Sequence, residues 1–299
     1  MSSPQPGIFR EGHRTLHVLE YTLKAGVSVA ELKVALRNVR ACLTAMDVAQ
    51  VLALGPQAWA QLAPTQQPQG LADFKPLTGP DAQAPATQRD ILVWLHGPAR
   101  DAVFDAATAV DHALRAVARR DLDLPGFVYR DSRDLTGFID GSANPKDDPA
   151  KRDTALVPDG QAGAGGAFVL SQRWLHDLDA FNALPQAEQE RVIGRTKPDS
   201  IELEGDAQPA NSHVSRTDLK IDGVGQKMYR RSFPFGTAGE HGLYFLAFAC
   251  EQARFSHVLD SMFGLTGDGV TDHLMQFSKA DTGSYWFAPS EEDLNAALD

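Results

Sequence analysis

The segment GFIDGSANP, residues 137–145, carries a single carboxylate, Asp140, between an apolar residue and a glycine. A carboxylate in this setting can cap a turn, because Asp-Gly and Asn-Pro are common turn dipeptides. The same carboxylate can serve as a general acid and base if the fold places it in a reaction site. The segment alone favours the turn, so support for catalysis has to come from the rest of the chain.

Motifs of several enzyme classes are missing from the sequence. The nine histidines form no HxxxH or HExxH pair, and no acidic cluster has the spacing of a zinc or calcium site. There is no GxSxG segment, and the glycine-rich GQAGAGG lies in a loop without a following amphipathic helix. The two cysteines, Cys42 and Cys250, form no CxxC or CxxCH motif. Nucleotide-binding, zinc and serine-hydrolase functions therefore have no support.

The balance of charge limits the partners of the protein. Its 299 residues include 28 basic and 39 acidic residues, which give a formal net charge of −11. Such a surface repels the phosphates of nucleic acids and of anionic lipids, so we expect no nucleic acid and no membrane as a partner. The N-terminal MSSPQPGIFREGH shows no export signal, GLYFLAFAC is too short to span a bilayer, and free cysteines suit a reducing compartment. We therefore expect a cytoplasmic protein.

Apolar periodicity predicts the same order of elements twice along the chain. The first part has expected strands at 13–23, 48–54, 91–96 and 126–130, and helices at 28–46, capped by Ser28, and at 101–119. The second part has expected strands at 168–174, 227–233, 243–250 and 284–287, and helices at 186–193 and 251–263. Each part follows the order β-α-β-β-α-β. The predicted fold class is α+β, with two ferredoxin-like (βαββαβ) halves related by duplication, antiparallel sheets and peripheral helices. We place the N-terminal domain at 1–125 and the C-terminal domain at 126–299.

Two long loops interrupt these halves. One covers residues 56–88, which are rich in Pro, Gln, Gly and Ala and should hold one short helix, and the other covers 142–166, directly after GFIDG. Loops of this length in a compact domain often cover a functional site. The alternative is a mobile surface insertion, and for 56–88 it has equal weight.

Three segments, GFIDGSANP, ANSHVSRTD and MYRRSFPFGT, together resemble the dye-decolourising peroxidase (DyP-type haem peroxidase) family. GFIDG matches the GxxDG motif of that family. The likeness extends over most of the chain through RDLTGFIDGSANP, QRWLHDL, VIGRTK, NSHVSRTDLK, RRSFPFGT, HGLYFLAFAC, SMFG and YWFAPS. GxxDG alone is short, whereas the ordered set is specific, so the set reverses the preference for a turn at Asp140. The compact chain is similar to the bacterial type B subgroup.

The resemblance implies roles for the residues that match. His213 would be the proximal ligand of the haem iron, although nothing in its local sequence marks it as a ligand. Asp140 would be the distal acid and Arg230 the distal arginine. Arg231 is a rival for that role, but neighbouring residues of a strand face opposite sides, so only one of the two can point at the iron.

Three further residues would complete the cofactor site. Ser232 shares a face with Arg230 and would complete the pocket, Arg195 in IGRTK would pair with a haem propionate, and Asp272 would accept a hydrogen bond from the ring of the iron ligand. Asp268 is close by and remains an alternative for the last role. Two structural alternatives also stand: Asp272 as a turn or helix-end acid, and Arg230 as a surface charge at a strand edge.

The resemblance also implies the reaction. Hydrogen peroxide binds the iron through one oxygen, and its proton must reach the other oxygen before the O–O bond breaks. Asp140 would relay that proton, and Arg230 would stabilise the developing negative charge and favour the ionised carboxylate. We expect a peroxidase with non-covalent haem b, one per chain, that passes through a ferryl intermediate. It would oxidise organic donors such as dyes, phenolics or porphyrinogens by one-electron steps.

A rival interpretation is a haem-binding or trafficking protein, active in iron or porphyrin handling, with incidental peroxidase activity. A carrier needs only a ligand and a pocket, so the presence of both Asp140 and Arg230 favours catalysis. We expect hydrogen peroxide and an organic reductant as partners, and a homo-oligomer. No packaging in an encapsulin shell is expected, because the chain ends at EEDLNAALD soon after FAPS, without a targeting extension.

Overall fold

The computed structural model describes residues 2–299, and the first part of this range forms a βαββαβ unit. Its elements are β1 (Thr15–Leu23), α1 (Val29–Thr44), β2 (Ala49–Leu54), α2 (Pro56–Leu62), the short β3 (Leu77–Thr78) and β4 (Gln83–Ala84), β5 (Ile91–Gly97), α3 (Arg100–Leu114) and β6 (Ala118–Phe127). The main strands lie in the order β2-β5-β1-β6, and each neighbouring pair is antiparallel. This order is the ferredoxin-like arrangement.

The second part repeats the arrangement with more insertions. Its elements are α4 (Asp148–Ala155), β7 (Ala167–His176), α5 (Leu178–Ala183), α6 (Gln186–Ile193), α7 (His213–Thr217), β8 (Lys220–Ile221), β9 (Val224–Gly225), β10 (Tyr229–Arg230), β11 (Phe233–Gly236), β12 (His241–Ala249), α8 (Ala253–Met262), β13 (Ser278–Ala280), β14 (Ser284–Ala288) and α9 (Glu291–Leu298). The strands lie in the order β10-β12-β7-β14, with β11 also beside β12 and β13 beside β7.

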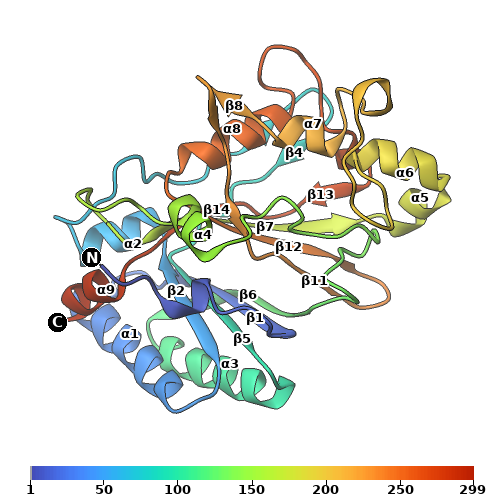
Figure 1. Ribbon diagram of the computed structural model, residues 1–299. Coiled ribbons are helices and arrows are strands. Elements are labelled where there is room, and N and C mark those ends of the chain that lie inside the picture. Colours follow the sequence, from blue (N-terminus) through green and yellow to red (C-terminus); the bar gives the residue numbers. More distant parts are fainter. Residues whose placement is uncertain (1) are drawn as a thin grey trace.

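One antiparallel contact joins the two units into a single ten-stranded sheet. β14 lies beside β2, with Phe287 opposite Leu54. In Figure 1, α1 and α3 cover the sheet of the first unit, and α5, α6, α7 and α8 gather over the second. The predicted fold class of two ferredoxin-like halves is confirmed. Within residues 2–299, no helix combines the length and the apolar character needed to cross a membrane.

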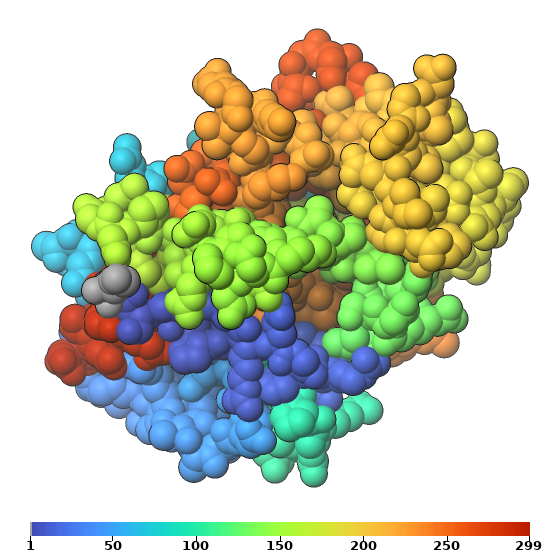
Figure 2. All heavy atoms as spheres, viewed as in Figure 1, coloured from blue at the N-terminus to red at the C-terminus, as the bar shows by residue number. Residues whose placement is uncertain are grey.

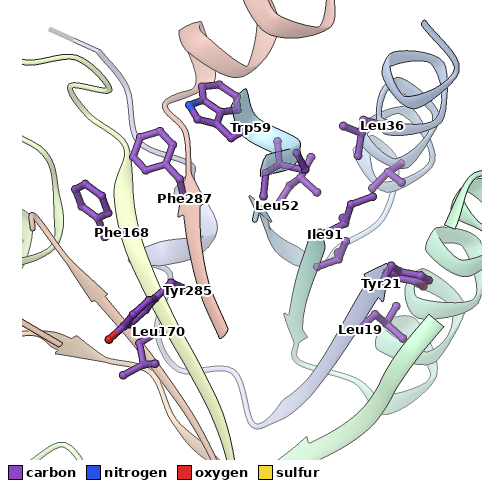
Figure 3. Close-up of a cluster of buried hydrophobic side chains, with 14 of the residues drawn as sticks. Leu19, Tyr21, Leu36, Leu52, Trp59, Ile91, Phe168, Leu170, Tyr285 and Phe287 are labelled. Atoms are coloured by element: carbon purple, nitrogen blue, oxygen red, sulfur yellow. The ribbon is translucent and has the colours of Figure 1, made fainter. Parts of the chain in front are cut away.

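The main hydrophobic core runs across this junction. Leu36 and Ile91 of the first unit and Phe168 and Phe287 of the second are buried in one cluster (Figure 3). Trp59 of α2 packs on Phe287, with ring centroids 5.6 Å apart. Because large apolar side chains from both units share one core, their burial stabilises the two units together rather than each alone.

Helix α1 follows the sequence prediction closely. Ser28 caps it, because the Ser28 hydroxyl accepts a hydrogen bond from the Glu31 amide while the Glu31 carboxylate accepts one from the Ser28 amide. This reciprocal pair is a capping box. The buried face of the helix consists of Leu32, Ala35, Leu36, Val39 and Leu43, the residues whose spacing predicted a helix.

The boundary between α3 and β6 differs from the prediction. The helix expected at 101–119 ends at Leu114, and the strand expected at 126–130 is β6, which already starts at Ala118. Alternating charges in RRDLDLPGF conceal a strand at the edge of the sheet, where charged side chains meet water and cross-strand partners. His17 of β1, for example, lies 2.6 Å from Asp123 of β6.

The strand expected at 227–233 is divided in two. β10 and β11 both pair with β12, and the chain leaves regular pairing at Arg231 and Ser232 between them. The Arg231 amide still donates to the Leu246 carbonyl at 2.7 Å. The break matters because it sets which way the two adjacent arginines point.

The two long loops are both ordered. In the 56–88 loop, Phe74 is buried with its ring centroid 5.0 Å from that of Tyr285, and Gln88 donates to the Tyr285 carbonyl at 2.7 Å. The 142–166 loop contains α4 and crosses the face shown in Figure 2 as a green band between the blue N-terminal and orange C-terminal segments. Ser142 and Ala143 at its start line the cavity described below. This second loop therefore covers part of a site.

Glu20 of β1 carries a buried carboxylate that connects the two units. It lies on the face of the sheet opposite to the cavity described below. The Arg89 guanidinium pairs with one of its oxygens, and the hydroxyls of Tyr244 on β12 and Ser171 on β7 donate to the other. The indole of Trp286 on β14 donates to the Ser171 hydroxyl at 2.9 Å. Burial raises the pKa of Glu20, and the Arg89 charge opposes that rise. The carboxylate is thus fully bonded by groups from both units.

We expect Glu20→Gln to lower the free energy of unfolding by about 3–5 kcal/mol, because it leaves the Arg89 charge without its buried partner. Chemical denaturation followed by circular dichroism measures this. Asp47→Asn is the control, since the Arg10–Asp47 pair is exposed and such pairs contribute about 0–1 kcal/mol. Equal losses for the two variants would show that the Glu20 network does not hold the units together.

Candidate active site

A large cavity lies in the second unit, between the sheet and the helices over it. Strands β7 and β12 form one wall, α7, α8 and the 3-10 turn His273–Gln276 form the other, and the GFIDG loop closes one side. The cavity has about 1620 Å³ of empty space, counting its open mouth. Its apolar lining consists of Phe138, Ile139, Ala143, Leu170, Trp174, Ile193, Val214, Met228, Leu243, Phe245, Phe255, Val258, Leu259, Met262, Leu274 and Met275. Such a cavity suits a large, mostly apolar ligand with a few polar contacts.

His213 is the first residue of α7 and points its ring into the helical side of this cavity. Ring nitrogen Nδ1 lies 2.6 Å from a carboxylate oxygen of Asp272, whose side chain is fully buried. The other Asp272 oxygen accepts a hydrogen bond from the Leu274 amide at 2.9 Å. These bonds fix the ring and leave Nε2 as the nitrogen available to a metal, as in carboxylate–histidine–metal arrangements.

The sequence left Asp268 and Asp272 as alternative partners of His213, and the geometry separates them. Asp268 lies 2.7 Å from the guanidinium of Arg216, and this pairing lowers the pKa of Asp268 to about 2. Only Asp272 of the two bonds the His213 ring. It also caps the 3-10 turn that follows it, so the role of turn acid and that of histidine partner coincide in one residue.

Asp140 lines the cavity from the GFIDG loop. Its Oδ1 accepts a hydrogen bond from the Gly141 amide at 2.7 Å, so the carboxylate also caps its own turn. Burial raises the pKa of Asp140, the Arg230 charge opposes this rise, and the charge of Asp134 adds to it. The turn and the cavity-lining role, which the sequence posed as alternatives, are therefore both present.

The glycines of the loop have a steric reason. Gly137 and Gly141 have φ values of 91° and 70°, in the left-handed region that favours glycine. A Cβ at Gly137 would also stand 2.6 Å from Cε of Lys197. The tight loop that presents Asp140 therefore requires glycine on both sides of FID.

Asn144 ties this loop to the strand that carries Arg230. Its amide nitrogen donates to the Arg230 carbonyl at 2.8 Å, and its amide oxygen accepts from the Arg230 amide at 3.0 Å. The side chain thus replaces a strand partner for β10. Asn144 thus ties the loop that carries Asp140 to the backbone of Arg230. This role of Asn144 was not predicted from the sequence.

The two adjacent arginines point in different directions. Arg230 lines the cavity, whereas the Arg231 guanidinium lies over the Trp94 ring at 4.9 Å and donates to the carbonyls of Ile8 and Arg10. The Ser232 hydroxyl accepts a long hydrogen bond, 3.4 Å, from the Leu246 amide, and Ser232 is not among the residues that line the cavity. The structure therefore brings Arg230, but neither Arg231 nor Ser232, to the cavity.

Arg195 lies at the mouth of the cavity and is already paired. Its guanidinium donates to the Ser200 carbonyl at 2.9 Å and to the Glu202 carboxylate at 2.6 Å. Glu202 also lines the cavity, and its side chain is 42% exposed. A ligand carboxylate would meet Arg195 here, in competition with Glu202.

Several cavity residues were missed at the sequence level. Asp134, His176 and Ser278 form a hydrogen-bonded row on the wall. Gln172 of β7 is 1% exposed, and its Nε2 has no hydrogen-bond partner in residues 2–299. The alternation of β7, with Leu170, Gln172, Trp174 and His176 on one face, was the available signal.

This donor set fits haem. One ring nitrogen is free and held by a buried carboxylate, the walls are apolar, and an arginine stands at the mouth for a carboxylate group. The unpartnered amide of Gln172 is a further polar atom that a bound molecule in the cavity would satisfy. Histidine ligation in an apolar pocket is a common way of holding haem iron.

Comparison with known proteins identifies the class of the molecule. The family model "Dyp-type peroxidase, N-terminal" matches residues 5–127, and "Dyp-type peroxidase, C-terminal" matches residues 131–293. The dye-decolorizing peroxidase of Mycobacterium tuberculosis is 36% identical over 248 residues, which cover 82% of this chain and 74% of that protein. The chain thus belongs to the DyP-type peroxidase family, and it is a haem-dependent peroxidase.

Solved structures agree over nearly the whole chain. A dye-decolorizing protein from V. cholerae has a TM-score of 0.88 at 36% identity and covers 98% of this chain and 99% of its own. A DypB variant of Rhodococcus jostii RHA1, solved in complex with heme, has a TM-score of 0.90 at 34% identity, with 99% of each chain covered.

We expect Asp272→Asn to weaken haem binding by about 10–100-fold, because the carboxylate that orients the His213 ring is lost. Titration of the haem-free chain with haem, followed by the Soret band, measures the affinity. Asp268→Asn is the matched control and should bind haem as the parent does, since Asp268 pairs with Arg216 instead. His213→Ala sets the lower limit. A loss at Asp268 that equals the loss at Asp272 would contradict the assignment.

Proposed function

We propose that this chain reduces hydrogen peroxide with one non-covalent haem b, held by His213, and oxidises organic donors such as dyes, phenolics or porphyrinogens by one-electron steps through a ferryl intermediate. The supporting observation is the presence of Asp140 and Arg230 in the same cavity as His213. A haem carrier needs a ligand and a pocket, but it has no use for an acid and an arginine in that same pocket. We further propose that the C-terminal domain, 126–299, carries the haem.

His213 and Asp272 would hold the cofactor from the helical wall. The bound haem supplies a redox-active iron, and Nε2 of His213 is the nitrogen for it. Arg195 would receive one propionate at the mouth after parting from Glu202. Ser232 lies between the two short strands and does not line the cavity, so its part in the pocket rests on the sequence prediction alone.

Asp140 would take the proton from peroxide at one oxygen and return it at the other. The carboxylate must be ionised to accept the proton and buried so that water does not compete. Its Oδ1 is held by the Gly141 amide, so Oδ2 is the oxygen free for this exchange. Arg230 would place its charge where the departing oxygen becomes negative, and Asn144 holds the backbone that carries this side chain.

The proposal also covers where the electron donors react, and the location and oligomeric state of the protein. Trp174 lines the cavity, whereas Tyr229, Tyr285 and Trp286 are buried in the core. We propose that small donors react at the mouth of the cavity and that electrons of larger donors reach it through the protein. A cytoplasmic homo-oligomer remains our proposal for its setting.

The test of the function is the reaction of haem-loaded protein with peroxide. A Soret band should appear on loading, and stopped-flow mixing should show a rapid spectral change. Asp140→Asn should keep the Soret band but slow the change by about 10²–10⁴-fold, because Asn has the same shape and cannot take a proton. Asn also caps turns well. A parental rate in Asp140→Asn would return this residue to a turn-capping role alone.

Arg230→Leu should slow the same spectral change by about 10²–10³-fold, because a fixed charge at the developing anion is lost. Its acid limb should also move to higher pH, since the Arg230 charge holds the pKa of Asp140 down against burial. The rate depends on ionised Asp140 and is lost as the pH falls through that pKa, so a higher pKa removes activity earlier. Arg231→Leu, outside the cavity, should leave the pH profile unchanged. A larger effect at Arg231 would refute the assignment.

A further inference from the structure

Three polar residues of the cavity wall have no task in the reaction described so far. His176 Nε2 lies 3.0 Å from Asp134 Oδ1, and His176 Nδ1 lies 2.8 Å from the Ser278 hydroxyl. The other Asp134 oxygen accepts from the Thr136 amide at 2.9 Å and from the Thr136 hydroxyl. The side chain of His176 is 5% exposed and that of Asp134 is 14% exposed. This is a nearly buried, fully bonded acid–imidazole pair inside the active-site cavity.

The loop fixes Asp134 relative to Asp140. Both residues belong to the segment 134–140 and line the same cavity. The Asp134 amide donates to the Phe138 carbonyl, and the Gly137 amide donates to the Asp134 carbonyl, each at 2.9 Å. The Arg133 guanidinium holds the outside of the loop through the carbonyls of Gly137, Lys197 and Pro198. The backbone positions that carry the two carboxylates are therefore fixed relative to each other.

Charged groups from three elements face Asp140. Arg230 from β10 and His213 from α7 favour its ionised form, and Asp134 from its own loop opposes that form. Burial, which is the largest influence, also opposes it. Asp134 itself stays ionised: burial raises its pKa, but the charge and hydrogen bond of His176 outweigh burial and hold this pKa at about 2. A negative charge that is paired with an imidazole thus lies in the same cavity as the proton-transfer group.

We propose that Asp134 and His176 are positioning residues that set the protonation state of Asp140. The Asp134 carboxylate makes Asp140 hold its proton more tightly, and His176, which pairs with Asp134, opposes this effect. The pair rests on the proposed function, because Asp140 is the group whose proton it controls. The two members act on the Asp140 carboxyl group in opposite directions. Asp134 places a negative charge near it, and His176 offsets that charge.

The test is an infrared titration of the haem-loaded protein without peroxide. The C=O stretch of protonated Asp140 is assigned by its loss in Asp140→Asn, and its amplitude is followed against pH. Asp134→Asn should shift the midpoint to lower pH by about 1 unit, and His176→Gln should shift it to higher pH by a similar amount. The acid limb of the peroxide reaction should move with the midpoint in each variant.

Two controls separate charge from damage to the cavity. Ser278→Ala removes the hydrogen bond to His176 without changing a charge, so its shift should be smaller than either charge variant gives. His17→Gln disrupts the His17–Asp123 pair, 2.6 Å apart and outside the cavity, and should give no shift. Midpoints that stay in place, or that move in the same direction in Asp134→Asn and His176→Gln, would overturn the proposal. If one of the two variants does not fold, the sign of the shift in the other still decides.

The two proposals can fail separately. The infrared midpoint requires no turnover, so opposite shifts in a protein that does not react with peroxide would support the charge pair and reject the proposed function. A fast peroxide reaction with unchanged midpoints would support the proposed function and reject the charge pair.

Discussion

The antiparallel pairing of β7 with β12 is the constraint on which the rest of the second unit depends. Its register places Gln172 opposite Phe245 on the cavity face, while Ser171 and Tyr244 point the other way, to Glu20. A slip of one residue would exchange the two faces. The cavity would then receive hydroxyls and the junction between the units would lose its partners for a buried carboxylate. One register therefore serves both the stability of the molecule and the shape of its active site.

The distal side of the cavity shows how a short loop becomes rigid. Glycines allow the turn, Asp140 caps it, and Asn144 bonds both backbone groups of Arg230. Each of these bonds also gives a partner to a half-buried polar group. If these groups act in the proposed reaction, they would need little reorganisation when charge develops, which is the main advantage of a preorganised site over water. The bonds that shape the loop are therefore the same bonds that would hold Asp140 and the Arg230 backbone in place for the proposed reaction.

Sequence motifs and apolar periodicity predicted much of the fold and of the candidate site. The predictions that were wrong or incomplete have physical reasons. Apolar spacing gave α1 and α6 within a few residues, and strand alternation indicated that Arg230 and Arg231 diverge. The start of the edge strand β6 was predicted too late in the chain. Its charged residues meet water, so the strand lacks an apolar signal. The bond between His213 and Asp272 joins residues 59 apart, and only the fold separates Asp272 from Asp268. The Asp134–His176 pair depends in the same way on long-range packing. The local sequence around either residue contains no signal that predicts the contact.

The sulfur atoms of the chain are distributed unevenly with respect to its oxidant. Cys250 is buried and Cys42 is half-buried, and burial raises the pKa of both thiols. Peroxide attacks thiolates rather than thiols, so both cysteines are poor targets. Met228, Met262 and Met275, in contrast, line the cavity into which peroxide must pass. Conversion of such a thioether to a sulfoxide would place a polar group in an apolar wall. An oxidant inside this cavity would therefore meet the sulfur of methionines and not that of cysteines.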